Sequence, residues 1–285
     1  MKRWMSISGL ILVTIIWGGG FVASDIALES LTPFQIMTGR FFLGALCMSI
    51  MSIKTMKNTS KKELQAGILM GIALFLGFAF QTVGLQYTTP SKNAFLTALN
   101  VVMVPFIAYV LLHKKVGKKG MLGAILSVIG VGLLSLNGDF KLGIGDFYTI
   151  LCAVSFAFQI FLTGQYVKKC SVMNLNCIQM VTSFLLSVCS LFVFKETEIQ
   201  WSSTGTLSIL YLGIISTTLC FMLQTACQKN VDETKAAIIL SMESVFGTLF
   251  SVILLHEVLS LRMMVGCVII LIAVIISNMA DVETV

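Results

Sequence analysis

Apolar runs of about 20 residues, with few charges inside them, recur along the whole chain and constrain its fold more than any other feature. A run of this length crosses the hydrocarbon core of a bilayer as a helix, because a helix satisfies its own backbone hydrogen bonds. Charged residues make up 11% of the 285 positions, against about 25% in a typical soluble domain. The pattern therefore predicts an all-α membrane protein with ten transmembrane helices. The predicted spans are 5–24, 33–53, 64–86, 92–112, 119–136, 144–167, 172–194, 204–227, 234–255 and 262–279.

The lysine and arginine residues divide unequally between the two sides of these spans. Fourteen fall on the side that holds both termini, four fall on the other side, and Arg40 lies inside a span. Positive residues are enriched in cytoplasmic loops, so we expect a multi-pass protein of the cell inner (cytoplasmic) membrane with both termini in the cytoplasm. The formal net charge of +6 then reflects topology. The expected partner is the lipid bilayer, and no nucleic acid.

The chain carries no pattern for a metal, a cofactor or a disulfide framework. The eight cysteines lie in or beside apolar runs without metal-ligand spacing, which is typical of buried free cysteine. Lys2 and Arg3 before an apolar run resemble a signal peptide, but nine further spans favour a first helix that stays in the membrane. We expect one transmembrane domain and no second, soluble domain.

The chain resembles itself when it is shifted by 143 positions. Residues 79–135 then align with residues 222–278 without a gap and with 12 identities in 57 positions. The matches include Gln81-Thr82 with Gln224-Thr225, Lys92 with Lys235, and Leu111-Leu112-His113 with Leu254-Leu255-His256. Apolar composition alone would not readily produce these matches in one register, so the sequence indicates an internal duplication.

Each repeat holds five spans, and this odd number forces the two halves to enter the membrane in opposite directions. We expect an N-terminal five-helix repeat at 1–137 and an inverted C-terminal five-helix repeat at 143–285, which together form one transmembrane domain. Inverted repeats are typical of secondary transporters, which bind substrate near the midplane and expose it alternately to the two sides. The alternative is a duplication that only builds a stable bundle.

Glu243 is a charged residue at the middle of a predicted span. It lies about ten residues into that span, roughly 15 Å deep, and its repeat equivalent is Asn100. A charge at this depth costs about 2.5–3.5 kcal/mol and needs a partner, a water-filled cavity or a function. Glu243 could bind a cationic group of a substrate, or carry a proton that alternates with substrate. The alternative is a protonated Glu243 in a structural hydrogen bond with a neighbour such as Asn100.

Arg40 and Trp17 are two further candidates. Arg40 lies seven residues past Pro33, roughly 10 Å from the outer face. It could anchor a substrate carboxylate, pair with Asp25, or extend to the interface. Trp17 precedes three glycines at 18–20, which predict either a bend or very close packing. Beside a bend, Trp17 could line a cavity and stack on a cation or a ring.

Four stretches, in this order, are similar to those of a known family. They are Ile16-Trp17-Gly18-Gly19-Gly20-Phe21, Gly39-Arg40-Phe41-Phe42, residues 84–95, and Glu243-Ser244-Val245-Phe246 followed by Leu254-Leu255-His256-Glu257. On these motifs, the whole chain resembles the EamA-type branch of the drug/metabolite transporter superfamily. The resemblance implies ten spans in two repeats around a central cavity, and transport of amino acids, amines, nucleobases or similar metabolites.

The resemblance also implies which residues line that cavity. Carried over to this chain, they are Trp17, Gln81, Asn100, Gln159, Gln224 and Glu243. The chain departs from the usual family pattern at Asn100 and at His113-Lys114, which leaves one midplane carboxylate and places any proton coupling on Glu243. These residues and Arg40 form the predicted substrate-binding site, which has no catalytic and no metal-binding member.

The predicted function is a secondary transporter that moves a small polar metabolite, such as an amino acid or an amine, by alternating access. It would act as a monomer or homodimer, with protons as an optional coupling partner. A flippase for a lipid-linked small head group is the nearest alternative. An intramembrane enzyme is a distant one: Gly143-Ile144-Gly145-Asp146 matches a motif of intramembrane aspartyl proteases, whose chemistry needs a second aspartate nearby. We expect a turn and a helix cap at Asp146, and no enzyme.

Overall fold

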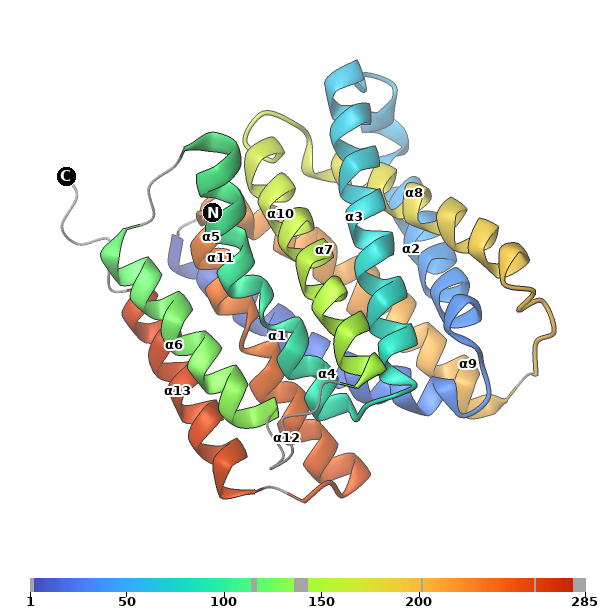
Figure 1. The fold of residues 1–285 in the computed structure, drawn as a ribbon. Helices are drawn as coiled ribbons and strands as arrows, with labels where there is room; N and C mark the ends of the chain where they lie inside the picture. The colour runs from blue at the N-terminus through green and yellow to red at the C-terminus, as the bar shows by residue number, and fades with distance from the viewer. Residues whose placement is uncertain (1–2, 114–116, 136–142, 201, 259, 279–285) are drawn as a thin grey trace.

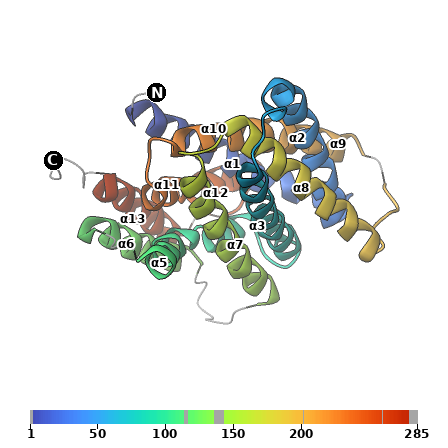
Figure 2. The same ribbon diagram turned by 90° about the horizontal axis from the view of Figure 1, so that it is seen from above.

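The computed structural model describes residues 3–113, 117–135, 143–200, 202–258 and 260–278. Every regular element in these ranges is a helix, and the helices pack into one bundle (Figures 1 and 2). The elements are α1 Arg3–Leu28, α2 Pro33–Met56, α3 Lys61–Leu85, α4 Pro90–Thr97, α5 Asn100–Leu112, α6 Lys118–Ser135, α7 Ile144–Tyr166, α8 Val172–Val193, α9 Ser203–Leu210, the π-helix η1 Tyr211–Leu219, α10 Cys220–Gln228, α11 Glu233–Leu240, α12 Glu243–Leu255 and α13 Leu261–Asn278.

Eight helical stretches are long and apolar enough to cross a membrane. They are Arg3–Leu28, Pro33–Met56, Lys61–Leu85, Pro90–Leu112, Ile144–Tyr166, Val172–Val193, Ser203–Gln228 and Glu233–Leu255. They coincide with eight of the predicted spans to within a few residues, so the all-helical, multi-pass fold is confirmed. The other two predicted spans, 119–136 and 262–279, fall on α6 and α13, whose apolar stretches Gly120–Gly130 and Met264–Ala273 are shorter. Both predicted spans run onto residues outside the described ranges, and the ten-span count stays a prediction.

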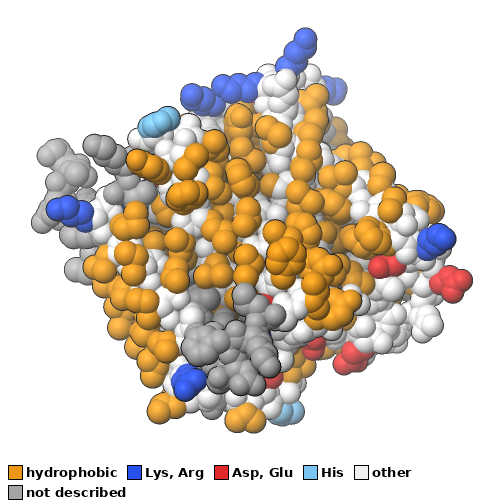
Figure 3. Space-filling view, viewed as in Figure 1, with side chains coloured by type: hydrophobic (Ala, Val, Ile, Leu, Met, Phe, Trp, Pro, Cys, Tyr) orange, Lys and Arg blue, Asp and Glu red, His pale blue; other side chains and the backbone are white. Residues whose placement is uncertain are grey.

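The surface of the bundle is suited to lipid. Large apolar side chains such as Ile50, Phe106 and Leu207 are exposed by 61%, 68% and 66%. In the view of Figure 3 hydrophobic side chains cover the middle of the molecule, and lysine and arginine side chains gather along one end. A bilayer would cover such a band, while the charged end would remain in the aqueous phase.

Helix bounds repeat along the chain with the period of the sequence match. α4, α5 and α6 begin and end 143 positions before α11, α12 and α13, respectively. His113 and His256 end α5 and α12 in the same left-handed conformation, with φ of 53° and 55°. Histidine rarely adopts this conformation, and here its backbone N–H bonds a carbonyl of the preceding turn. The shared Leu-Leu-His sequence therefore marks one and the same helix end twice.

The packing contacts also come in equivalent pairs. α6 lies beside α13 at one edge of the bundle and α2 lies beside α8 toward the other (Figures 1 and 2). α12 packs against α1 as α5 packs against α7, and α4 meets α12 as α11 meets α5. The helices that meet at the centre, α1, α5, α7 and α12, surround the site described below.

The three consecutive glycines of α1, at 18–20, serve close packing. α1 continues as a helix through them, and their contacts support very close packing, one of the two predicted alternatives. A Cβ at Gly18 would lie 2.6 Å from Cβ of Phe246 and 2.8 Å from the backbone nitrogen of Gly247, which no side chain tolerates. A Cβ at Gly20 would lie 3.1 Å from the hydroxyl oxygen of Ser216, which is a tight contact as well. The glycines therefore bring α1 against α12 and η1, and this contact holds Trp17 at the centre.

Candidate functional site

A cavity of about 470 Å³ lies at the centre of the bundle. Residues of α1, α2, α3, α5, α7, η1, α10 and α12 line it: Trp17, Gly20, Phe21, Ser24, Arg40, Phe78, Gln81, Asn100, Phe156, Gln159, Ile160, Ser216, Phe221 and Glu243. Its walls combine apolar side chains with a few convergent polar groups, a mixture that is typical of small-molecule sites.

The cavity brings together six of the seven residues that were predicted to bind substrate. Trp17, Arg40, Gln81, Asn100, Gln159 and Glu243 all line it. Gln224 does not. It is fully buried behind Gln159, and its Nε2 donates to Oε1 of Gln159 at 3.2 Å. Gln224 therefore supports the cavity wall instead of facing the cavity.

Asn100 and Glu243 enter the cavity from equivalent positions. Each is the first residue of its helix, after a two-residue turn that α4 and α5, and α11 and α12, share. In that turn the hydrogen bonds reach only three residues back, as in Val101 N to Ala98 O at 3.1 Å and Ser244 N to Ser241 O at 3.2 Å. Tightened turns of this kind inside a helix often mark a hinge at a functional site.

Neither of these two side chains makes a hydrogen bond to any described residue. Glu243 is only 5% exposed and Asn100 only 2% exposed. The Oδ1 atom of Asn100 is buried without a partner. The alternative of a structural Glu243–Asn100 hydrogen bond is therefore not formed. A buried polar group normally has a partner, so this pair is available to a ligand.

Arg40 is a buried cation on the same cavity. Its side chain is 2% exposed, which excludes extension to the interface. Nε donates to Oγ1 of Thr217 at 3.1 Å, and the guanidinium carbon lies 3.8 Å from the ring centroid of Phe78. Stacking on an aromatic ring can contribute about 2 kcal/mol when the cation is desolvated. The alternative of an ion pair with Asp25 is not formed, because Arg40 forms no salt bridge in the described part of the chain.

Aromatic side chains form most of the apolar wall. Trp17 lies with its ring centroid 5.0 Å from that of Phe221, and Phe78 lies 5.0 Å from Phe156. The sequence analysis assigns no role in the site to Phe78, Phe156 and Phe221. Their positions could have indicated one, because each stands three residues before a glutamine of the predicted site, at 81, 159 and 224, on the same helix face. Phe21, Ser24 and Ser216 were missed as well.

The π-helix η1 connects Trp17 and Arg40. The indole Nε1 of Trp17 donates to the carbonyl oxygen of Ser216 at 2.9 Å, and the next residue, Thr217, accepts from Arg40. Tyr211 at the start of η1 donates from its hydroxyl to the carbonyl oxygen of Ile16 at 2.8 Å. π-Helical turns are rare in proteins overall, and those that occur are often found at functional sites.

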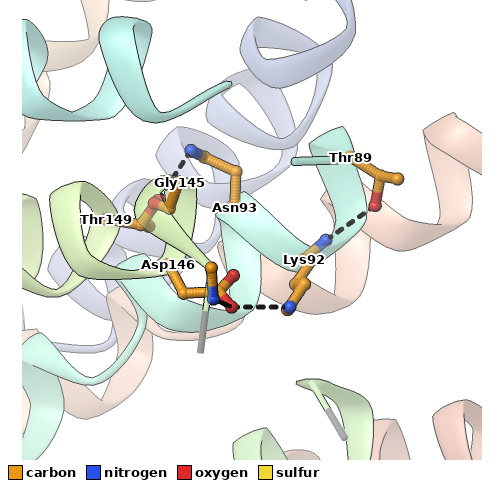
Figure 4. Close-up of polar contacts among 7 residues, drawn as sticks. Thr89, Lys92, Asn93, Gly145, Asp146 and Thr149 are labelled. Carbon is orange, nitrogen blue, oxygen red and sulfur yellow. Dashed lines mark hydrogen bonds and ion pairs between the residues drawn. The ribbon is translucent and has the colours of Figure 1, made fainter. Parts of the chain in front are cut away.

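A polar cluster closes the bundle where α4 and α7 begin (Figure 4). Lys92 Nζ donates to Oδ2 of Asp146 at 2.8 Å, and Asn93 Nδ2 donates to Oγ1 of Thr149 at 3.0 Å. The same Asp146 oxygen accepts from the backbone of Gly143 at 2.9 Å, so Asp146 is the expected helix cap. Its ionic partner is a lysine and not a second aspartate, which gives the protease motif no catalytic pair.

A sequence model of the EamA-like transporter family matches residues 4–136 and, separately, residues 143–279. The chain belongs to the EamA-like transporter family. The resemblance drawn from four motif stretches is thus confirmed. An uncharacterized transporter of Archaeoglobus fulgidus is 35% identical to this EamA-like protein over 279 residues, 98% of this chain and 87% of that one. The uncharacterized transporter YoaV of Bacillus subtilis is 23% identical over 270 residues, 92% of each chain.

A solved crystal structure shares the fold of this EamA-like protein. The two agree with a TM-score of 0.81 at 16% sequence identity, over 99% of this chain and 100% of that one. Similarity at this level of identity shows the fold alone. With the apolar helices, the family match identifies a multi-pass membrane protein of a transporter family, and transporters are not enzymes.

Proposed function

We propose that this EamA-like protein is a secondary transporter that moves a small zwitterionic metabolite across the cytoplasmic membrane by alternating access. Arg40 and Glu243 carry the proposal. They place a guanidinium group and a carboxyl group on one buried cavity, and neither has an ion-pair partner among the described residues.

The charge pattern of the cavity favours a substrate with both a carboxylate and an ammonium group. A buried charge without a counter-ion is energetically costly, and an oppositely charged group of a bound substrate would lower that cost. A zwitterion would supply a partner to Arg40 and to Glu243 at once, while a purely cationic or anionic solute would supply only one. The rings of Trp17, Phe78 and Phe221 favour an apolar body on that zwitterion.

The duplication supports alternating access. The family matches two separate segments of the chain, and the bounds of α11, α12 and α13 in the second repeat those of α4, α5 and α6 in the first at a spacing of 143 residues. The two repeats would enter the membrane in opposite directions. If the repeats exchange their conformations, a cavity that is open to one side of the membrane becomes open to the other side. The turns before Asn100 and Glu243 are suitable hinges.

Charge distribution supports a cytoplasmic location for both termini. Within the described ranges, the end of the bundle that holds Arg3 and the 54–62, 118–119 and 168–169 segments carries most of the lysine and arginine residues (Figure 1). We call this the inner end, and the end that holds Lys92 and Asp146 the outer end. This orientation follows the positive-inside rule.

Proton coupling would rest on Glu243. Its carboxylate could hold either the ammonium group of the substrate or a proton, and this competition exchanges substrate for proton. Asn100 occupies the equivalent position without a titratable group. One carboxylate therefore gives at most one such proton in each transport cycle.

The test is substrate-evoked charge movement on solid-supported membranes that carry the reconstituted protein. The panel holds L-phenylalanine, its decarboxylated analogue 2-phenylethylamine, other amino acids, nucleobases and sugars. A current evoked by zwitterionic amino acids and abolished by Glu243→Gln supports the proposal. A silent wild type leads to radiolabel counterflow, because electroneutral exchange gives no current. Silence in both assays, with lipid scrambling in the same vesicles, would favour a flippase.

A further inference from the structure

The π-helix η1 passes α2 unusually closely, at the helical turn that carries Arg40. A Cβ at Gly213 would lie 2.7 Å from Cβ of Leu43 and 3.2 Å from the carbonyl oxygen of Arg40. On the α2 side, a Cβ at Gly44 would lie 3.2 Å from Cγ2 of Thr217. Because glycine stands at both contact points, the backbone of η1 reaches the side of α2 from which Arg40 projects.

Three consecutive residues of η1 have three different hydrogen-bond roles. Ser216 presents its carbonyl oxygen to Trp17, and Thr217 presents its hydroxyl oxygen to Nε of Arg40 at 3.1 Å. Thr218 bonds back to the carbonyl oxygen of Gly213, five residues earlier, at 2.8 Å. Ser216 and Thr217 thus act on cavity residues, while Thr218 acts only within the π-helix.

Thr217 engages one of the five N–H donors of Arg40. A guanidinium carries one N–H on Nε and four on its two terminal nitrogens, arranged as a planar fork that matches a carboxylate. Thr217 takes the Nε–H, and Phe78 covers one face of the plane at 3.8 Å. No described residue accepts a hydrogen bond from the terminal nitrogens. The Nε edge and one face of the guanidinium are therefore held by Thr217 and Phe78, and the N–H groups of its terminal nitrogens remain available to a ligand.

We propose that Thr217 is a positioning residue, held by the π-helix, that orients the guanidinium of Arg40 for two-pronged binding of a substrate carboxylate. The role assigned to the carboxylate rests on the proposed function. The contact between Thr217 and Arg40 does not, and it can be measured separately.

The variants are chosen to separate the contact from general packing. Thr217→Val keeps the shape of the side chain and removes the acceptor, while Thr217→Ser keeps the hydroxyl. Thr218→Val is the matched control, because Thr218 is the adjacent buried threonine and its hydroxyl bonds only Gly213. Thr217→Ala replaces Thr217→Val if the latter does not elute as a monodisperse protein.

Arg40 can be observed directly by NMR. The chain contains only three arginines, Arg3, Arg40 and Arg262, so ¹⁵N-arginine labelling in nanodiscs gives three Nε–Hε signals, and Arg40→Lys assigns one of them. We expect Thr217→Val to shift the Arg40 signal and to accelerate its exchange with water. Thr217→Ser and Thr218→Val should leave it in place. An Arg40 signal that is unchanged in Thr217→Val overturns the positioning role, whether or not the protein transports phenylalanine.

Transport kinetics test whether the position of the Arg40 guanidinium serves the binding of a substrate carboxylate. In Thr217→Val we expect KM for L-phenylalanine to rise about tenfold, the value of one well-placed hydrogen bond, with Vmax little changed. KM for 2-phenylethylamine, which has no carboxylate, should stay the same, and Thr217→Ser should restore the wild-type value. An equal loss for both solutes would contradict a role toward the carboxylate. No phenylalanine transport by the wild type, together with a shifted Arg40 signal, would count against the proposed function and leave the Thr217–Arg40 contact established.

Discussion

Asn100 and Glu243 are each the first residue of a helix that follows a tightened turn, and both line one cavity without a hydrogen bond to any described residue. They stand 143 positions apart, the same offset at which the chain resembles itself. The two helix starts share one backbone arrangement, but one presents an amide and the other a carboxyl group.

Asn100→Ala should impair transport more than folding. Because the Asn100 amide has no partner among the described residues, its removal should cost less than about 0.5 kcal/mol of stability, while KM for the substrate rises. Asn93→Ala is the contrasting variant, since Asn93 Nδ2 donates to Thr149 and to the carbonyl oxygen of Gln81. It should lower stability by about 1–3 kcal/mol. Thermal unfolding in detergent and counterflow in liposomes measure the two effects, and a stability loss in Asn100→Ala equal to that in Asn93→Ala would refute the distinction.

Arg40→Lys should lose selectivity for a carboxylate. Lysine keeps the charge but offers no planar fork and stacks less well on Phe78. KM for L-phenylalanine should rise at least about tenfold, while 2-phenylethylamine should bind as before or better. The measurement is KM for both solutes, determined in parallel in Arg40→Lys and in the wild type. Retention of wild-type phenylalanine affinity in Arg40→Lys would show that Arg40 does not hold the carboxylate.

Gly18→Ala should destabilise the bundle. The added Cβ would meet the backbone and Cβ of Phe246 at 2.6–2.7 Å, and such overpacking costs about 1–3 kcal/mol. Gly132→Ala is the matched control, because a Cβ at Gly132 meets nothing within 4 Å. There alanine should be neutral or raise stability by up to about 1 kcal/mol. Equal unfolding temperatures for the two variants would mean that α1 and α12 are not in close contact.

Lys92→Met should weaken the outer end of the bundle. It removes the partner of Asp146, a carboxylate only 2% exposed, although the backbone of Gly143 continues to donate to it. We expect a loss of about 1–3 kcal/mol, less than for a fully buried pair, because Lys92 is partly exposed. Lys57→Met, at an exposed inner position, should have no effect. In the double variant Lys92→Met/Asp146→Asn much of the lost stability should be recovered. No recovery would argue against a direct pair of Lys92 and Asp146.

The sequence predicted the helices well because the bilayer fixes their length. About 20 apolar residues are needed for each crossing, and the loops between them carry the charges. The breaks in the fourth and ninth predicted spans could not be predicted in the same way. Pro105, the residue that would indicate a break, lies inside α5, and the turn at Ala98 and Leu99 contains neither glycine nor proline. That turn is set by tertiary packing around the cavity.

Polar members of the cavity were predictable, and apolar members were not. A glutamine, an arginine or a glutamate inside an apolar span requires an explanation, so Gln81, Gln159, Arg40 and Glu243 stand out. Phenylalanine does not, because one of the 20 phenylalanines that faces lipid looks the same in sequence as one that faces the cavity. The π-helical register of η1 also has no sequence signal. It alone separates the roles of Thr217 and Thr218.

If Arg40 and Glu243 hold the two charged ends of one substrate, Glu243→Gln should weaken substrate binding. The measurement is counterflow of radiolabelled L-phenylalanine in proteoliposomes, with Glu198→Gln, an exposed loop position, as the control. We expect strong uptake by the wild type and the control, and a loss of at least about tenfold in apparent affinity in Glu243→Gln. Uptake by Glu243→Gln with wild-type affinity would show that Glu243 does not bind the substrate.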